Sequence, residues 1–410
     1  MLLNNAGGSN TAIGTAALAF NDSGDSNTAT GAFALYSNAT GSQNTATGIN
    51  TLYSNTTGGG NTATGFSALF LNEAGGQNTA AGYQALYENI GGNGNSAFGW
   101  SALQSNTADD NTAIGSHALT SNTDGQSNTA VGTSALENNT SAALNTGVGY
   151  SALASNDTGQ ANTGVGGDAL LNNLDGNFNT ATGVAALLNN LHGIGNTANG
   201  ANALRDNTAN FNTATGANAL LHNTSGTENT ATGVNALATN TAANENTAVG
   251  ASALAANNAA ANTAVGANAL SANDSGSDNT GVGNNALANN VTGFSNVAVG
   301  ADALKLNGAA GSGFANTAIG DNALSMNTTG NSNTAVGQAA LINNVTGAGN
   351  IALGNGAGFS VNAGNFIICI GANGANVDHS CYINNIWEQS GGSQAVYVNS
   401  QGKLGAQVSS

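Results

Sequence analysis

Residues that could bind a metal or act as a nucleophile are scarce in this chain. Among its 410 residues are four His and two Cys. His117, His192 and His222 fall in different copies of a sequence repeat, and the His and Cys residues form no cluster with the spacing of a metal site. We therefore expect no bound metal and no cofactor, and we assign these His residues to exposed positions or turns.

The two cysteines, Cys369 and Cys381, lie near the C-terminus. In an extracellular protein they could form a disulfide. They could equally be two buried thiols in a terminal cap. The sequence leaves both possibilities open.

Paired carboxylates would be needed for glycoside hydrolysis. Asp109 and Asp110 are the only adjacent acidic pair, and no cation lies near them in the sequence. The glycine-rich stretch 308–313 lacks the Lys-Ser/Thr pair of a phosphate-binding loop. We therefore expect no enzymatic activity, and a polysaccharide-degrading β-helix enzyme is the least favoured of three functions considered below.

Aromatic residues recur at a fixed interval in the N-terminal third. One column takes the tenth place of successive repeats (Tyr36, Tyr53, Phe70, Tyr87) and another takes the sixth place (Phe66, Tyr83, Trp100). Such columns would thicken an interface between chains if buried, or contact a glycan if exposed. We favour burial at an interface and keep glycan contact as the alternative.

These residues are positioned by a 17-residue repeat, N-T-A-x-G-x-x-A-L-x-x-N-x-x-G-x-x. We number its places from the first Asn, so that Asn10 holds place 1. Later copies open at intervals of 16, 17 or once 20 residues until Asn350. Gly holds place 5, Leu place 9 and Asn place 12 of the complete copies, beginning with Gly14, Gly31, Gly48, Leu18, Leu35, Leu52, Asn21, Asn38 and Asn55. A fixed period of this size predicts a solenoid whose coils bury their apolar residues by stacking.

Each repeat predicts one coil of an all-β, parallel solenoid. Thr11 to Ile13 has the alternation of a short strand, and we expect a second strand around Ala17 and Leu18. Asn21 and Gly24 are turn residues that tolerate positive φ. Stacked Asn21, Asn38 and Asn55 can form a hydrogen-bonded ladder. Coils spaced by roughly 4.8 Å would make a rod of about 100 Å.

The expected core is thin, with one Leu, two Ala and one variable Ile, Val or Thr in each coil. At about 25 cal/mol per Å² of buried apolar area, one such column is marginal. We therefore predict association of identical chains, with a homotrimer as the preferred arrangement.

Charge and hydropathy limit the partners. The net charge of −17, with only three Lys and Arg, argues against nucleic acid and anionic membrane surfaces. No apolar run reaches the length of a membrane span. We divide the chain into a repeat shaft at 1–358, which starts in the middle of a repeat as a fragment would, and a C-terminal capping or trimerisation module at 359–410.

The strand phrase resembles the repeats of trimeric bacterial adhesin heads, which form left-handed parallel β-rolls from a shorter repeat. The segments 381–386, 390–405 and 408–410 are similar to the junction that precedes the endosialidase-type intramolecular chaperone of phage tail fibres and bacterial surface fibres. That chaperone trimerises the fibre and then cuts itself off. The resemblance implies a matured trimer or a chain ending at this junction, with Ser409 and Ser410 at the maturation point and the chaperone absent.

These observations predict a structural, extracellular fibre shaft, either an adhesin at a cell surface or a tail fibre of a virion. Its expected partners are identical chains, in a trimer or a longer fibre, and a surface glycan or receptor. The alternative to this function is an ice-binding solenoid, because Thr11, Thr28, Thr45 and Thr62 open a Thr column at place 2.

Overall fold

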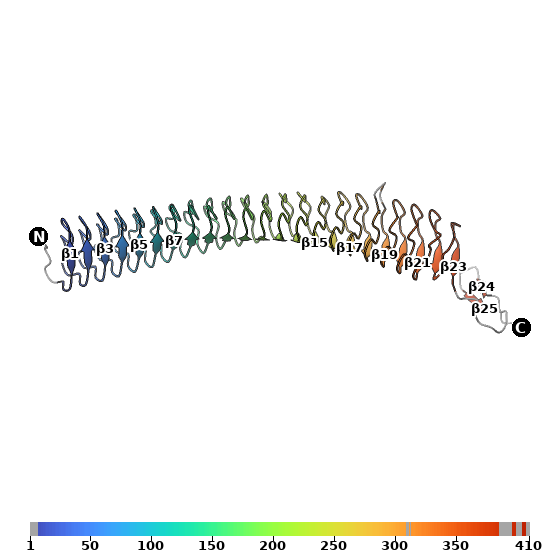
Figure 1. The fold of residues 1–410 in the computed structure, drawn as a ribbon, viewed down its shortest axis with the longest axis horizontal. Helices are drawn as coiled ribbons and strands as arrows, with labels where there is room; N and C mark the ends of the chain where they lie inside the picture. The colour runs from blue at the N-terminus through green and yellow to red at the C-terminus, as the bar shows by residue number, and fades with distance from the viewer. Residues whose placement is uncertain (1–6, 309–310, 312, 385–395, 399–403, 407–410) are drawn as a thin grey trace.

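The computed structural model describes residues 7–308, 311, 313–384, 396–398 and 404–406. Within these residues the chain contains no helix, and one three-residue strand opens each coil (Figure 1). Twenty-three strands form one sheet. The strands are β1 (Thr11–Ile13), β2 (Thr28–Thr30), β3 (Thr45–Thr47), β4 (Thr62–Thr64), β5 (Thr79–Ala81), β6 (Ser96–Phe98), β7 (Thr112–Ile114), β8 (Thr129–Val131), β9 (Thr146–Val148), β10 (Thr163–Val165), β11 (Thr180–Thr182), β12 (Thr197–Asn199), β13 (Thr213–Thr215), β14 (Thr230–Thr232), β15 (Thr247–Val249), β16 (Thr263–Val265), β17 (Thr280–Val282), β18 (Val297–Val299), β19 (Thr317–Ile319), β20 (Thr334–Val336), β21 (Ile351–Leu353), β22 (Ile368–Ile370) and β23 (Cys381–Ile383).

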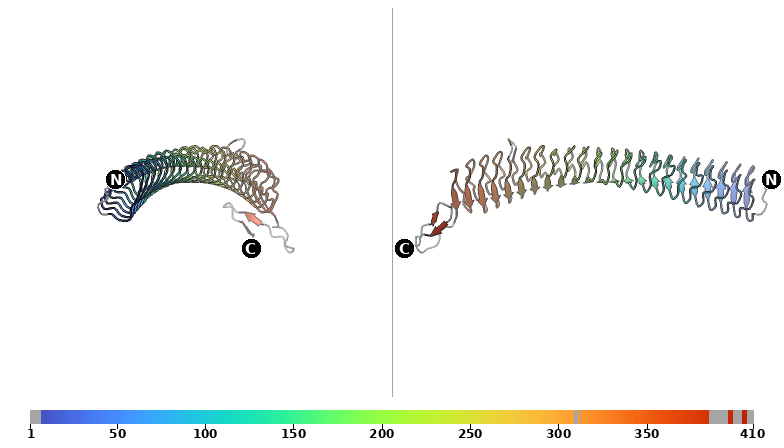
Figure 2. Two further views of the ribbon diagram at one scale, coloured as in Figure 1. Left: turned by 60° about the vertical axis from the view of Figure 1, so that its left-hand side comes forward. Right: turned by 180° about the vertical axis from the view of Figure 1, so that it is seen from behind.

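Neighbouring strands pair in parallel and in register, so that each place of the repeat stacks on the same place of the next coil. Thr11 pairs with Thr28, Ala12 with Ala29, and Ile13 with Thr30. The stack is a gently curved rod with β1 and β23 at opposite ends (Figures 1 and 2). The prediction of an elongated, all-β parallel solenoid is therefore confirmed.

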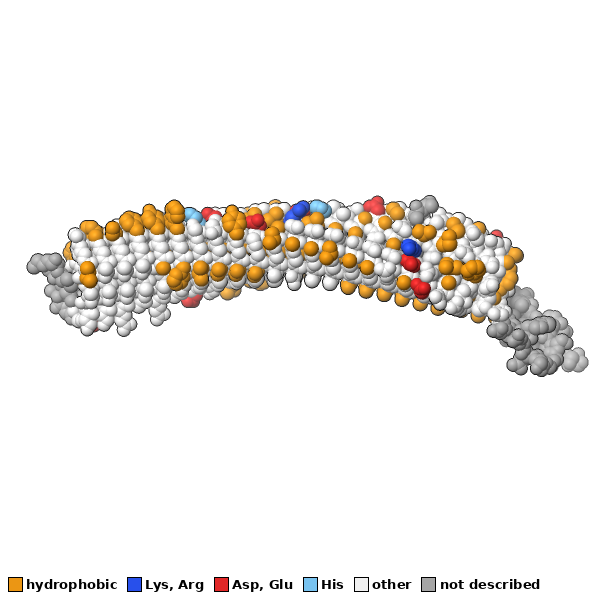
Figure 3. All heavy atoms as spheres, viewed as in Figure 1, with side chains coloured by type: hydrophobic (Ala, Val, Ile, Leu, Met, Phe, Trp, Pro, Cys, Tyr) orange, Lys and Arg blue, Asp and Glu red, His pale blue; other side chains and the backbone are white. Residues whose placement is uncertain are grey.

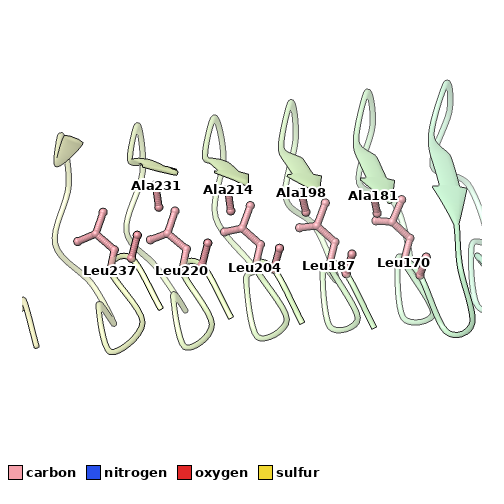
Figure 4. Packing of buried hydrophobic residues seen from close by; sticks show 14 of the residues in the cluster. Leu170, Ala181, Leu187, Ala198, Leu204, Ala214, Leu220, Ala231 and Leu237 are labelled. Carbon is pink, nitrogen blue, oxygen red and sulfur yellow. The ribbon is translucent and has the colours of Figure 1, made fainter. Parts of the chain in front are cut away.

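The interior is built from two facing columns of small and branched side chains. The strand contributes Ala at place 3, and the opposite side of the coil contributes Leu at place 9 (Figure 4). Leu18, Leu35 and Leu52 are fully buried. Since each Leu packs against its counterparts in the coils above and below, no coil has a complete core of its own.

The second predicted strand is absent, because residues around Ala17 and Leu18 form a turn. Leu at place 9 adopts a left-handed backbone, with φ of 53° at Leu18 and 50° at Leu35, and place 7 does the same, with 54° at Ala16. This conformation costs an L-residue about 1–2 kcal/mol. Burial of the Leu side chain returns about 1.5–3 kcal/mol, and the Leu18 N–H donates to the Ala34 carbonyl of the next coil at 2.9 Å.

One further expectation about the coil was wrong. The variable residue at place 4 is not part of the core: Ile13 is 62% exposed and Phe98 is 42% exposed, since alternation along a strand sends places 2 and 4 outward when place 3 points inward. Asn21 and Gly24 do not adopt positive φ. Asn21 is instead buried, and its Nδ2 donates to the Gly24 carbonyl at 3.0 Å.

Two columns of buried Asn run along the rod. At place 12, Asn38 Nδ2 donates to Asn21 Oδ1 at 2.7 Å and to the Gly41 carbonyl at 2.8 Å, and Asn55 repeats the pattern one coil later. At place 1, the backbone N–H of Asn27 donates to Asn10 Oδ1 at 2.8 Å. Every buried side-chain nitrogen and oxygen in the described residues has a hydrogen-bond partner. The two Asn ladders therefore satisfy polar groups that the turn would otherwise bury unpaired.

Glycine marks the two closest approaches between coils. Gly14 has a φ of 134°, and a Cβ there would lie 2.5 Å from the Gly31 carbonyl oxygen. Gly41, at place 15, has no such φ, but a Cβ would clash with the Gly58 carbonyl oxygen of the next coil. In the 16-residue coil that starts at Asn95, Asn106 Nδ2 reaches the carbonyl of Ala108, two residues on instead of three. The Asn side chain thus absorbs a one-residue deletion without breaking the stack.

The Asn ladders end near the C-terminus. Val361 and Ile367 occupy places 12 and 1 after Asn344 and Asn350, and both are fully buried. An apolar residue here means that the column does not end in a buried Asn whose side chain has no Asn in the next coil to bond with. The sheet continues beyond residue 358, because β22 pairs in register with β21 and β23 pairs in register with β22.

Beyond β23, β24 (Val396–Val398) and β25 (Leu404–Ala406) form an antiparallel pair. The predicted maturation point, Ser409 and Ser410, lies outside the described residues.

Candidate interaction surface

The outward side of the strands is a regular surface that follows the 23-stranded sheet along the rod. We call it the strand face and define it as places 2 and 4 of β1–β23. The chain has 20 Asp and Glu, three Lys and Arg, and four His. None of these residues lies in β1–β23. A protein with a net charge of −17 therefore keeps this whole face free of ionisable side chains except for the thiol of Cys381.

Place 4 divides the strand face into blocks. Two blocks are polar: the first comprises Thr30, Thr47 and Thr64, and the second comprises Thr182, Asn199, Thr215 and Thr232. Two blocks are apolar: the first comprises Phe98, Ile114, Val131, Val148 and Val165, and the second comprises Val249, Val265, Val282, Val299, Ile319, Val336, Leu353 and Ile370. In Figure 3 apolar side chains form rows along the rod, and a wide area without them lies toward the N-terminal end.

The polar blocks are arrays of Thr. Both outward residues are Thr in β2, β3, β4, β11, β13 and β14. Among the described residues, the hydroxyls of these Thr make no hydrogen bond to another protein group. They are therefore available to solvent or to a ligand.

No protein-family model, curated protein or solved structure matches the chain. Its function must therefore be argued from its surfaces. None of the described segments is a helix suited to crossing a bilayer. In the described ranges, no three His, Cys, Asp or Glu side chains come together as a metal site would require.

The aromatic column at place 10 is a continuous stack of half-buried rings. The ring centroids of Tyr36 and Tyr53 are 4.9 Å apart, those of Tyr53 and Phe70 are 5.1 Å apart, and those of Phe70 and Tyr87 are 5.1 Å apart, all nearly parallel. Phe20 meets Tyr36 edge to face at 4.9 Å. Since the inner rings cover one another's faces, this column presents mainly ring edges to solvent.

The aromatic column at place 6 is more exposed. Phe66 and Tyr83 stack with centroids 5.4 Å apart, and Trp100 lies edge to face against Tyr83 at 5.9 Å. Trp100 is 59% exposed. His117 of the next coil lies 5.9 Å from the indole, with its ring tilted by 36°. Of the two columns, this one offers the larger accessible aromatic area to a glycan.

The charged side chains form small surface clusters. Arg205 donates from Nε and an Nη to the two carboxylate oxygens of Asp206, at 3.0 and 2.9 Å, and His222 Nδ1 lies 2.9 Å from Asp206 Oδ2. The hydrogen bonds from Arg205, followed by those from His222 and Asn189, lower the pKa of Asp206 to about 2. This arrangement holds one coil to the next and has no nucleophile.

The remaining candidate residues lie apart. Asp109 Oδ1 accepts a hydrogen bond from the Asn93 backbone N–H at 2.7 Å, so this carboxylate serves a turn of the neighbouring coil. His192 Nδ1 contacts Asp175 Oδ1 at 2.6 Å, and His379 stacks on Phe366.

Cys369 and Cys381 lie on opposite sides of the sheet. Cys369 points inward beside Tyr382, whereas Cys381 points outward beside Ile368. Both thiols are free, and burial raises the pKa of Cys369. The structure does not bring them together as a disulfide.

Sequence reasoning missed the strand face. The signal was present, because every strand reads T-A-x or a close variant in which the two flanking residues point the same way. Treating the variable residue as core concealed the fact that the outward positions carry no charge and alternate in blocks.

Proposed function

We propose that this chain is the structural shaft of an extracellular fibre, assembled from three identical copies that contact one another through the strand face. The observation that carries the proposal is the absence of charged residues from β1–β23 in a strongly acidic chain. Depletion of charge is typical of the core of a protein interface. Because the acidic residues all lie elsewhere, copies can approach on this side without like-charge repulsion.

The size of the strand face also supports association. Three residues of strand are about 10 Å wide, and 23 strands at about 4.8 Å spacing extend about 110 Å, giving on the order of 1,000 Å² for each copy. One standard pairwise interface buries about 800 Å² from each partner, so the face has the area of one such contact, which each copy of a trimer divides between its two neighbours. The β-branched residues of the apolar blocks would gain the burial that the thin Leu and Ala interior lacks.

Recognition of a surface glycan or receptor belongs, in this proposal, to the exposed aromatic residues at place 6. Trp100, Tyr83 and Phe66 offer a run of ring area to sugar C–H groups, with Trp100 the most exposed. A Trp100→Ala variant should bind glycan arrays more weakly, whereas Tyr150→Ala, at the same place three coils away, should bind as the parent does. Equal loss in both variants would contradict this assignment.

Sedimentation equilibrium combined with electron microscopy tests the shaft. We expect the mass of three chains in rods with the length of one chain. Compact particles with the mass of one chain would overturn the proposal.

Ice binding is the second candidate, and the Thr blocks favour it specifically. In β2–β4 and in β13 and β14, paired Thr hydroxyls without protein partners repeat at the spacing of neighbouring strands. Such a flat, regular array can order water. Thermal hysteresis that is lost in a Thr45→Tyr variant would support ice binding, and its absence at high protein concentration would exclude this function.

A further inference from the structure

The block pattern of the strand face contains information about how two copies face each other. From the N-terminal end, place 4 holds Ile13 in β1, is polar in β2–β4, holds Ala81 in β5, and is apolar in β6–β10, polar in β11–β14 and apolar in β15–β23. The order is not symmetric, because the second apolar block is longer than the first and lies at one end. Two copies can therefore match their blocks in few relative positions.

We propose that the blocks set the polarity and the axial register of assembly: copies lie parallel and in register, with each apolar block against the same block of its partners. This inference rests on the proposed function, since it specifies how the strand faces of the fibre meet. The occupant is a second copy of this chain, and the polar blocks form hydrated stretches between the two apolar contacts.

An antiparallel arrangement mismatches the blocks. Reversal of one copy places β3 against β21, so that Thr47 faces Leu353, and the whole first polar block meets the end of the second apolar block. The place 4 Thr hydroxyls of β2–β4 would then each face an apolar side chain at place 4 of β20–β22, which offers no hydrogen-bond partner. An unpaired buried hydroxyl costs about 1–3 kcal/mol.

A small axial slip of parallel copies is unfavourable for the same reason. A shift by two coils would place β11 and β12 against β9 and β10, setting Thr182 and Asn199 against apolar residues of the first apolar block. A shift of nine coils matches β2–β4 with β11–β13 and β6–β10 with β15–β19, but it sets the second polar block against the apolar residues of β20–β23. That shift leaves 14 of the 23 strands overlapping, so it buries less area than the arrangement in register.

Crosslinking between single cysteines distinguishes these arrangements in the full chain. In a Cys381→Ser background, a Val148→Cys variant places one exposed thiol in the first apolar block, and Cys369 stays buried. A short bifunctional maleimide should join Val148→Cys chains to one another. Thr158→Cys, on an exposed turn of the same coil, is the matched control and should not be joined. A Val336→Cys variant repeats the test in the second apolar block.

Mixed assemblies report the relative position directly. When chains carrying Val148→Cys are assembled with chains carrying Val249→Cys, an antiparallel arrangement would crosslink unlike chains, because β9 then faces β15. With Val299→Cys as the second chain, unlike crosslinks would reveal the nine-coil shift. We expect at least tenfold more crosslinking between like chains than between unlike chains in both mixtures. Predominantly unlike crosslinks would overturn the inference.

The outcomes separate this inference from the proposed function. A single-chain mass in sedimentation would refute the fibre shaft itself. A three-chain mass in which Thr158→Cys is joined and Val148→Cys is not would leave the shaft standing and refute the strand face as the contact. Circular dichroism of each variant verifies that the solenoid has folded.

Discussion

The N-terminal coils at β2–β5 and the C-terminal coils at β15–β22 have the same interior and different exteriors. In β2–β5 and in β15–β20, Leu at place 9 and Asn at places 1 and 12 are buried, and place 3 holds buried Ala except for Gly281 in β17. Outside, the N-terminal coils carry Thr on the strand face and a stacked aromatic column at place 10. The C-terminal coils carry Val, Ile or Leu at place 4 of the strand face, and Thr at place 2 in β15–β17, β19 and β20.

The contrast between a constant interior and a variable exterior separates the residues that the fold requires from the residues that set the properties of the surface. Interior places are constrained by neighbours on both sides of every coil, so the same residues recur throughout. Outward places face no other part of this chain. Their variation by blocks, rather than at random, supports the proposed contacts between identical chains.

The largest effect should come from the interior and should be equal in the two regions. Asn55→Ala and Asn273→Ala each remove the side-chain bonds to the previous Asn and to a Gly carbonyl, and each takes away one of the two acceptors of the next Asn. Since an unsatisfied buried group costs about 1–3 kcal/mol, we expect each variant to lose about 3–5 kcal/mol of unfolding free energy in urea titrations.

Asn138→Ala, at an exposed place, is the control and should change stability by less than about 0.5 kcal/mol. A cost in one region only would mean that the two interiors are not equivalent.

Substitutions on the strand face should weaken association of the chains to different extents in the C-terminal and N-terminal coils. A Val265→Lys substitution puts a charge into the second apolar block and should weaken association at least tenfold, because burying an unpaired ammonium group is costly. Thr47→Lys, in the first polar block, should weaken association less, since that stretch is hydrated. Sedimentation velocity across a concentration series measures both. Equal weakening would remove the distinction between blocks.

The aromatic column should stabilise only the N-terminal region. Tyr53→Ala removes two stacking contacts, with Tyr36 and Phe70, each worth about 0.5–1.5 kcal/mol. We expect a loss of about 1–3 kcal/mol, measured by hydrogen exchange of the surrounding coils. Ser271→Ala occupies the same place in a C-terminal coil and should leave exchange nearly unchanged. A similar effect at both positions would contradict a regional role for the rings.

The smallest effect concerns Asp206, between the two regions. Its pKa is about 2 in the folded chain, below its ordinary value, so the unfolded chain takes up the proton first as the pH falls. Its stabilisation is therefore complete above about pH 4 and lost as the pH falls toward 2. Because the cluster lies at the surface, we expect about 0.5–1 kcal/mol.

Comparing parent and Asp206→Asn unfolding at pH 7 and pH 2 measures this contribution. The difference should be present at neutral pH and absent in acid. A difference that persists at pH 2 would assign the effect of the substitution to packing.

The sequence alone determined the period, the parallel stack, the buried Leu and the places of Gly14, Leu18 and Asn21 in repeating columns. Those features follow from local chemistry repeated at a fixed interval, which any coil must satisfy against an identical neighbour. Only the tertiary structure decided that Leu18 sits in a left-handed turn instead of a strand. The free energy gained by burying its side chain outweighs the cost of the left-handed backbone conformation, which an L-residue normally avoids. It likewise decided that Val148 and Val265 point outward, since which side of a strand faces the core depends on the closing path of the whole coil.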